Sequence, residues 1–414
     1  MNVLEQIQAL QFTDKAGAEA LLCDFIAATF TLNVESVELR PLAVSLNSFN
    51  GIMTLTDGRR LFFKTHIEPN GVIGEYYNAA TLAQAGYPVL QPILSSTEAG
   101  KQFLIYEVID DPSVFDVAWV IERGDETRVS VLDRAQGRAD QALWGLYQKT
   151  LEKQDAQSAA SAPIHQLFYH RLTGGRLASF YGDDAHDVTI TLPDGEHSMR
   201  EVRQAQWTIN GQVYAETLAD IIARAVKLLD PAVADVSIIG HGDAHNGNVF
   251  LREHEGEPSL LYFDPAFAGR HHPLLDLTKP LFHNVFAMWM YFPRVIADEL
   301  KITLERDDAR WIITHNYALH PVRAMFLESK IYHVLERLVP FLKARNELRS
   351  DWRGYLKAAL FCCPFLTMNL ADTAKFPPQI ALLGLSMAIE MGSESAGQRS
   401  LIDQALDDVE RALA

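Results

Sequence analysis

Residues 237–250 read SIIGHGDAHNGNVF, and this short stretch says more about the fold than any other part of the chain. The apolar pair Ile238–Ile239 enters a cluster of His, Gly, Asp and Asn residues, and a second apolar pair leaves it. Such a pattern predicts two strands joined by a tight polar loop, with glycines at the sharp bends. Asp243 and Asn248 lie five residues apart on this loop, and their side chains are the first candidates for chemistry.

Length and composition set the outer limits. The chain has 414 residues, of which 48% are hydrophobic and 21% charged, so it can build a large core and more than one lobe. A formal net charge of -17 argues against a nucleic-acid partner, which requires a basic face. We expect no membrane span, since the apolar stretches are short. The three cysteines have no metal-ligand spacing and fit a cytoplasmic protein.

The first part of the chain alternates between strand and helix signals. A helical pattern covers residues 16–30, and residues 33–109 then predict the order β-β-β-α-β-β. The expected elements are strands over Val37–Val44, Ile52–Leu55 and Leu61–His66, a helix over Gly74–Ala85, and strands over Val89–Ser95 and Phe103–Ile109.

The remainder is expected to be mainly helical. Helices are predicted over residues 131–153 and 216–229, with a loop or weak helix end over 154–163. Residues 187–214 carry two hairpin signals, a Pro-Asp-Gly turn and an Asn-Gly turn. From Pro273 onward the pattern is helical almost throughout, and the aromatic residues there, Trp311 among them, are assigned to helices.

The polar loop has the residues that phosphoryl transfer requires. Such chemistry needs a carboxylate that orients or deprotonates the attacking hydroxyl, and an oxygen ligand for the Mg²⁺ on the nucleotide phosphates. Asp243 fits the first role and Asn248 the second. A Mg²⁺ usually also has a carboxylate ligand, and an apolar strand at 260–263 is followed by Asp264. The sequence therefore predicts a metal site made by Asn248 and Asp264.

The N-terminal segment supplies candidates for a nucleotide site. Lys64 lies near the end of the third predicted strand, and Glu75 near the start of the next helix. A strand lysine held by a helix glutamate is the arrangement with which kinases bind the α- and β-phosphates of ATP. The turn at 45–51 occupies the place of a phosphate-covering loop, and 103–110 that of a link presenting backbone groups to adenine. The nucleotide-binding residues predicted there are Ser48, Asn50, Glu107 and Val108.

Three stretches resemble the aminoglycoside phosphotransferase and choline kinase-like family of small-molecule kinases. HGDAHNGNVF at 241–250 matches the HGDxHxxN loop of that family, and YFDPAFAGRHHPLLDL at 262–277 matches its metal-binding segment. GEYYNAATLAQAGYPVLQPI at 74–93 is similar to its helix and strand after the lysine. The DPA at 264–266 is also similar to fructosamine kinases. The resemblance covers roughly residues 35–110 and 216–285.

This resemblance implies a fold, a cofactor set and a substrate class. The fold is α+β and two-lobed, protein-kinase-like, with a small antiparallel β N-lobe over 1–109 and a mainly helical C-lobe over 110–414. A hairpin insertion is expected near 187–214. The implied cofactors are ATP and Mg²⁺, and the implied acceptor is a hydroxyl of an amino sugar, an amino alcohol, a ketoamine or a similar small molecule. The downstream Asp276 is expected to brace the catalytic loop.

The histidines leave alternatives open. His241 is expected to lock the loop by hydrogen bonds, since Asp243 already fills the role of the base. His245 either bonds within the loop or faces the phosphates. The pair His271–His272 beside Asp276 favours loop packing over a metal site, because no further ligand has suitable spacing.

Two other functions compete with a small-molecule kinase. A protein kinase is the first, although no arginine stands between His241 and Asp243 and no peptide-docking segment is recognisable between Asp264 and Asp276. The second is a nucleotide-binding pseudokinase without catalysis. The presence of all four polar catalytic positions argues against that reading.

Overall fold

The computed structural model describes residues 2–40, 48–66, 71–98, 100–307 and 309–413, without the side chains of residues 48, 66 and 71–77. The chain divides into two compact units. The first unit comprises Met1–Pro112 together with the short segment Leu261–Ala268, and the second comprises Ser113–Leu260 and Gly269–Ala414. Each unit is described by itself below.

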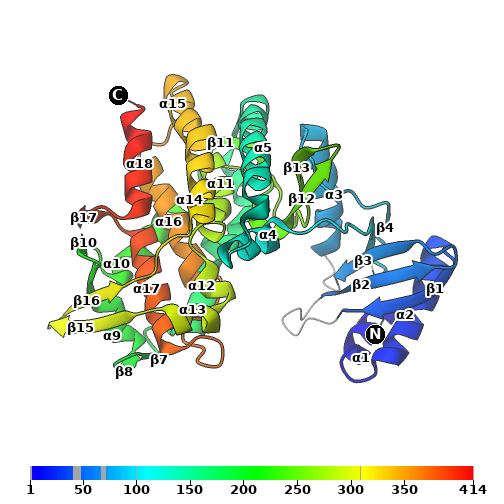
Figure 1. The fold of residues 1–414 in the computed structure, drawn as a ribbon, viewed down its shortest axis with the longest axis horizontal. Helices are drawn as coiled ribbons and strands as arrows, with labels where there is room; N and C mark the ends of the chain where they lie inside the picture. The colour runs from blue at the N-terminus through cyan, green and yellow to red at the C-terminus, as the bar shows by residue number, and fades with distance from the viewer. Residues whose placement is uncertain (1, 41–47, 67–70, 99, 308, 414) are drawn as a thin grey trace. The chain divides into compact units, whose positions relative to one another are not determined.

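The first unit is built around a five-stranded antiparallel sheet with the strand order β1-β2-β3-β5-β4. Helices α1 and α2 cover one face of this sheet (Figure 1). The elements are α1 (Val3–Leu10), α2 (Lys15–Phe30), β1 (Val34–Leu39), β2 (Ser48–Leu55), β3 (Arg60–His66), α3 (Gly71–Ala85), β4 (Leu94–Ser96) and β5 (Phe103–Glu107).

Strand β3 decides what each face of this sheet carries. Leu61, Phe63 and Thr65 are buried, and the Phe63 ring stacks on Phe103 at a centroid distance of 5.4 Å in the core under α2. Because successive side chains of a strand point to opposite faces, Phe62 and Lys64 lie on the other face. The sheet thus has one face for the core and one that presents the predicted lysine.

The second unit is mainly helical. Its helices are α4 (Val114–Glu122), η1 (Glu126–Arg128), α5 (Val129–Thr150), α6 (Ala156–Ala160), η2 (Pro163–Leu167), α7 (Tyr169–Thr173), α8 (Arg176–Tyr181), α9 (Met199–Gln204), α10 (Leu218–Leu228), η3 (Asn246–Asn248), α11 (Pro273–His283), α12 (Met288–Tyr291), α13 (Pro293–Glu299), α14 (Pro321–Lys330), η4 (Ile331–Leu335), α15 (Glu336–Ala344), α16 (Trp352–Leu366), α17 (Pro378–Gly392) and α18 (Leu401–Arg411). Helix α16 packs against α10, α11 and α17, and these contacts form the centre of the core.

The strands of the second unit form small sheets between these helices. They are β6 (Glu152–Gln154), β7 (Thr189–Leu192), β8 (Gly195–Ser198), β9 (Gln206–Ile209), β10 (Gln212–Tyr214), β11 (Asp235–Gly240), β12 (Val249–His254), β13 (Glu257–Tyr262, whose last two residues belong to the first unit), β14 (Gly269–His271), β15 (Ile302–Asp307), β16 (Arg310–His315) and β17 (Ser395–Gly397). The sheet orders are β14-β11-β6, β15-β16-β9-β10-β17, β7-β8 and β12-β13.

The predicted α+β class is confirmed, with an antiparallel sheet in one unit and mostly helices in the other. Both hairpins predicted in 187–214 are also present, as β7-β8 and β9-β10. In the part of the chain described by the structure, no helix has the length and apolar character to cross a bilayer.

The expectation of helices almost throughout after Pro273 is wrong for residues 302–307 and 310–315. These residues form the hairpin β15-β16, and Trp311 is a strand residue that pairs with Trp207 of β9. Trp311 and Ile313 are buried while the residues between and beside them are less so. This two-residue alternation is the mark of a half-buried strand.

Two predicted elements have other boundaries. The helix over 131–153 ends at Thr150, and the next residues form β6. The strand predicted over Val89–Ser95 shrinks to β4 and a single bridge at Val89, because Pro92 has no amide hydrogen for a continuous ladder.

Candidate active site

The polar loop follows β11, the central strand of the sheet β14-β11-β6. The strand ends at Gly240, where a side chain is not tolerated. A Cβ at this position would lie 2.6 Å from the carboxylate of Asp276 and 2.6 Å from Nε2 of His271. Glycine therefore allows Asp276, from the first turn of α11, to approach the loop closely.

Asp276 is fully buried and bonded on both oxygens. Its Oδ1 accepts a hydrogen bond from the Gly242 amide at 2.6 Å and faces Nε2 of His271 at 3.1 Å, and its Oδ2 accepts from the Tyr147 hydroxyl at 2.6 Å. Burial by itself would raise the pKa of Asp276. The bonds from His271, Tyr147 and Gly242 outweigh it and lower the pKa to about 2. The carboxylate thus ties three elements to the start of the loop.

Asp243 and Asn248 are joined by a hydrogen bond across the loop. The amide nitrogen of Asn248 donates to the backbone oxygen of Asp243 at 3.0 Å. With its nitrogen engaged, Asn248 retains its side-chain oxygen, the kind of ligand that Mg²⁺ takes. The amide of Asn246 donates to Oδ1 of Asn284 at 2.7 Å, which anchors the turn η3 between the two residues.

Both loop histidines accept hydrogen bonds from the loop backbone. His241 is fully buried, and its Nδ1 accepts from the amide of Asp243 at 3.4 Å. Nδ1 of His245 accepts from the amide of Gly247 at 3.1 Å and caps η3. The bond of His245 within the loop is the first of its two predicted alternatives, and a contact with phosphates stays a prediction.

Sequence analysis missed one cation beside Asp243. Lys279 lies on α11 three residues after Asp276, on the same helix face, and its Nζ is 3.7 Å from Oδ1 of Asp243. The same Nζ lies 3.2 Å from Nε2 of His283, whose Nδ1 is 2.7 Å from the hydroxyl of Tyr291. The i, i+3 spacing from the bracing aspartate was the signal that could have identified Lys279.

The first unit holds the other predicted groups. Lys64 on β3 and Asn50 on β2 are directly opposite each other in the antiparallel ladder, so their side chains share a face of the sheet. On this face Leu104 and Tyr106 of β5 form a small apolar cluster with Phe62 and Leu90. Leu104 and Tyr106 are buried and Phe62 and Leu90 half-buried, and the register of β3 and β5 places this cluster beside the lysine.

Asp264 follows β13 within the first unit and has an unusual backbone. Its φ is +55°, a left-handed conformation that costs energy for residues other than glycine and is often found at functional sites. The amide nitrogen of Asn78 donates to the backbone oxygen of Pro265 at 3.2 Å and supports the turn. Nζ of Lys64 is 2.7 Å from Oδ1 of Asp264. The structure therefore brings the predicted phosphate-binding lysine and metal-binding carboxylate together.

Four other predicted residues have known positions along the chain, and their roles stay predictions. Glu75 lies in α3 and Ser48 begins β2, but both side chains, and residues 45–47 of the predicted turn, lie outside the described residues. Glu107 ends β5 and is exposed, and Val108 follows it half-buried.

A metal centre made only of protein ligands is not found. Over the part of the chain with described side chains, no group of three His, Cys, Asp or Glu residues is placed to hold a metal ion. His271 contacts Asp276, and Nε2 of His272 lies 3.8 Å from Asp235. Burial lowers the pKa of His272 to about 4. Both histidines are therefore packed inside the second unit.

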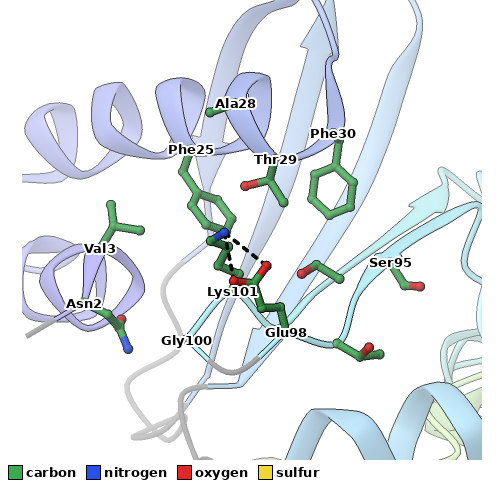
Figure 2. Close-up of a pocket in the computed structure, with 12 residues that line it drawn as sticks. Asn2, Val3, Phe25, Ala28, Thr29, Phe30, Ser95, Glu98, Gly100 and Lys101 are labelled. Carbon is green, nitrogen blue, oxygen red and sulfur yellow. Dashed lines mark hydrogen bonds and ion pairs between the residues drawn. The ribbon is translucent and has the colours of Figure 1, made fainter.

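An open hollow of about 780 Å³ lies elsewhere in the first unit (Figure 2). Its lining includes Phe25 and Phe30 of α2 and residues 95–98. Its lysine, Lys101, is paired with Glu98 at 3.0 Å. None of the predicted site residues lines it, so this hollow is not the candidate site.

No protein-family model matches the chain, and no curated protein matches its sequence. Similar solved structures include an amicoumacin kinase in complex with AMP-PNP, Ca²⁺ and Ami, 16% identical, with a TM-score of 0.48 over 90% of this chain and 93% of that one. A thermostable mutant of aminoglycoside phosphotransferase APH(4)-Ia is 12% identical, with a TM-score of 0.46 over 89% and 97%. A putative fructosamine-3-kinase from Thermobifida fusca is 14% identical, with a TM-score of 0.41 over 89% and 96%.

Proposed function

We propose that the chain is an ATP-dependent phosphotransferase that moves the γ-phosphoryl group to a hydroxyl of a small molecule. The observation that carries this proposal is the loop 241–248. Its aspartate and asparagine are held on one rigid turn by a buried brace, Asp276, that bonds the backbone between strand and loop. Phosphoryl transfer depends almost entirely on such positioning and on electrostatic stabilisation.

Asp243 acts on the acceptor in this proposal. Its Oδ1 is buried and has no hydrogen-bond donor among the described residues, and a donor is what an attacking hydroxyl supplies. Asp243 orients the hydroxyl towards the γ-phosphorus and accepts its proton late, because the transition state is loose and the hydroxyl keeps its proton during most of the attack.

The first unit binds the nucleotide in this proposal. Lys64 binds the α- and β-phosphates, with Glu75 as its partner on α3, while Ser48 and Asn50 on β2 cover the phosphates. The apolar cluster of Leu104, Tyr106, Phe62 and Leu90 packs against adenine, and the backbone of Glu107 and Val108 bonds its edge. The support is that Lys64, Asn50 and the cluster share one face of the sheet.

In this proposal Asn248 and Asp264 are the protein ligands of a Mg²⁺ ion. Both provide oxygen donors, and one carboxylate with one amide oxygen is enough for an ion that also takes phosphate oxygens and water. Mg²⁺ would neutralise charge on the β- and γ-phosphates. The left-handed backbone of Asp264 sets the direction of its carboxylate, and Lys64 is the group that pairs with it in the structure.

The acceptor is a small molecule in this proposal, and neither nucleic acid nor a membrane is expected as a partner. The net charge of -17 disfavours binding to phosphate backbones. The three cysteines are free thiols and fit a reducing compartment, so we place the enzyme in the cytoplasm.

The test is acceptor-stimulated release of ADP from ATP and Mg²⁺ by the purified chain. The acceptor panel contains aminoglycosides, amino alcohols, ketoamines, polyols and hydroxy acids, and a peptide library covers the protein-kinase alternative. We expect at least one small hydroxyl compound to stimulate ADP release, and Asp243→Asn to abolish the stimulation. ATP binding with no stimulation by any compound would favour a pseudokinase and contradict the proposal.

A further inference from the structure

The surroundings of Asp243 in the second unit are more positive than the net charge of the chain suggests. Lys279 is buried on α11 with its Nζ 3.7 Å from Asp243. Arg171, on the short helix α7, is the second cation, and its guanidinium donates to Oγ1 of Thr367 at 3.2 Å. A buried lysine and a half-buried arginine that is under the electrostatic influence of Asp243 thus accompany one carboxylate.

The effects on neighbouring groups confirm this imbalance. The pKa of His283 is well below its usual value, first because the ring is buried and then because Lys279, His245 and Arg171 surround it. Burial and Arg176 lower the pKa of Arg171, and Asp243 is the carboxylate that opposes this effect. The neutral form of His283 is therefore favoured, and Asp243 is the carboxylate that lies beside Lys279.

Other buried lysines in the same unit are fully compensated. Lys330 donates directly to the carboxylate of Asp140, which also accepts from Ser329. Lys357 donates to Asp403 in the same way. Lys279 instead stays at 3.7 Å from Asp243, beyond hydrogen-bonding range. This pair lacks the geometry of a purely structural ion pair.

Two polar atoms at this place have no partner. Oδ1 of Asp243 and Nε of Arg171 are both buried, and neither has a hydrogen-bond partner among the residues that the structure describes. Unsatisfied buried polar atoms are rare in folded proteins, and an uncompensated buried cation is costly. The donor on Arg171 suits an anion and the acceptor on Asp243 suits a hydroxyl.

We propose that Lys279 and Arg171 bind an anionic group of the acceptor, so that the substrate is a hydroxyl compound carrying a carboxylate or another oxyanion. The inference rests on the proposed function and narrows it. Asp243 receives the hydroxyl, and the two cations bind the acidic group of the same molecule. Polycationic acceptors such as aminoglycosides are disfavoured, because their ammonium groups would enter a positive site.

The binding test uses pairs of compounds that differ in one acidic group: gluconate and glucitol, glycerate and glycerol, 4-(hydroxymethyl)benzoate and 1,4-benzenedimethanol. Thermal unfolding is followed without nucleotide at constant ionic strength. We expect at least one acid to raise Tm by about 2 °C or more above its neutral partner, since a ligand that binds only the folded state stabilises it. If no acid exceeds its partner, the inference is wrong.

Variants show whether the two cations are responsible. Lys279→Met and Arg171→Met should remove the advantage of the acid, while Lys279→Arg keeps the charge and should preserve part of it. Lys227→Met, on the exposed side of α10, is the matched control and should behave as the wild type. Should Lys279→Met fail to fold, Arg171→Met decides. An acid advantage that persists in Arg171→Met and in a folded Lys279→Met overturns the assignment.

Turnover measurements distinguish two anions that Lys279 and Arg171 could bind, the acidic group of the acceptor and the γ-phosphoryl group. We expect the ratio of kcat/KM for the acid to that for its neutral partner to fall at least tenfold in both variants. Equal losses with both acceptors would assign the cations to the γ-phosphoryl group and overturn the inference. If acids bind through Lys279 and Arg171 but release no ADP, the proposed function fails and the anion site stands.

Discussion

Lys64 and Asp264 form an ion pair within the first unit, Lys279 and Asp243 lie close together within the second, and the two pairs differ in closeness and burial. In the first unit Lys64 and Asp264 are 2.7 Å apart, and their side chains are 17% and 40% exposed. In the second unit Lys279 and Asp243 are 3.7 Å apart and 4% and 15% exposed. The close pair is the more exposed one, although burial normally favours close pairing.

This difference indicates that the two pairs respond differently when a substrate binds under the proposed function. In the first unit Lys64 and Asp264 compensate each other's charge, and under the proposed function nucleotide and metal would provide their other partners. In the second unit the pair is separated by the fold itself, since the brace on Asp276 fixes the loop and His283 contacts Lys279. The polar atoms left over are available for the acceptor.

The largest effect is expected for Asp243→Asn. The amide cannot accept the proton of the hydroxyl, so kcat of the folded variant should fall by a factor on the order of 10³. Asp298→Asn, an exposed aspartate of α13, is the matched control. Initial rates of ADP release measure both. A loss of less than tenfold in Asp243→Asn would remove Asp243 from the role of base.

The second prediction concerns stability and the buried pair. Lys279→Met removes the cation nearest to Asp243 and leaves only Arg171 to oppose the charge of this largely buried carboxylate, so we expect the free energy of unfolding to fall by about 3 kcal/mol. Urea denaturation monitored by fluorescence gives the value. An unchanged unfolding midpoint would show that the Lys279–Asp243 pair contributes no more to stability than a surface ion pair. The two lysine–aspartate pairs would then differ less than proposed.

The third prediction is the pH dependence of the brace. The pKa of Asp276 is lowered to about 2 in the folded state, from roughly 3.9 when unfolded. A depressed carboxylate pKa stabilises the fold above the unfolded value, and this stabilisation is lost as the pH falls from about 4 through about 2. It amounts to on the order of 2 kcal/mol.

In Asp276→Asn the free energy of unfolding should therefore decrease less steeply than in the wild type as the pH falls from about 4 to about 2. Urea titrations between pH 2 and pH 7 would show it. If the free energy of unfolding depends on pH in the same way in the variant and in the wild type, the Asp276 carboxylate is not the cause of the loss of stability in acid.

The smallest effect is expected for the exposed pair. Lys64→Met should change the free energy of unfolding by less than about 1 kcal/mol, because partly exposed ion pairs contribute little. It should raise KM for ATP by roughly tenfold, equivalent to about 1.4 kcal/mol of lost phosphate binding. The two measurements together separate binding from stability. A large loss of stability with unchanged KM would reverse the comparison between the two pairs.

Much of this could be predicted because the signals are local. The β-β-β-α order follows from alternation and turn residues between neighbouring strands, and the loop 241–248 follows from glycines next to polar residues. The i, i+3 spacing from Asp276 places Lys279 on the same face of α11, but its approach to Asp243 depends on how α11 packs. The hairpin β15-β16 was not predicted, although Ile302 and Leu304 alternate with polar residues as in a strand, and its partner, β9, is about a hundred residues away in the chain.

The pairing of Lys64 with Asp264 was missed for the same reason. The two residues are separated by 200 positions, and only the fold of the first unit brings them together. The apolar cluster around Tyr106 requires knowledge of which faces of β3 and β5 coincide, which the register of the sheet supplies.

Phosphorus NMR of a reaction mixture with ATP, Mg²⁺ and the acceptor that best stimulates ADP release tests the central claim most directly. The account predicts a new phosphate-ester resonance that grows with the ADP signals in the wild type and is absent with Asp243→Asn. Inorganic phosphate as the sole product, or the same ester formed at the same rate by Asp243→Asn, would contradict it.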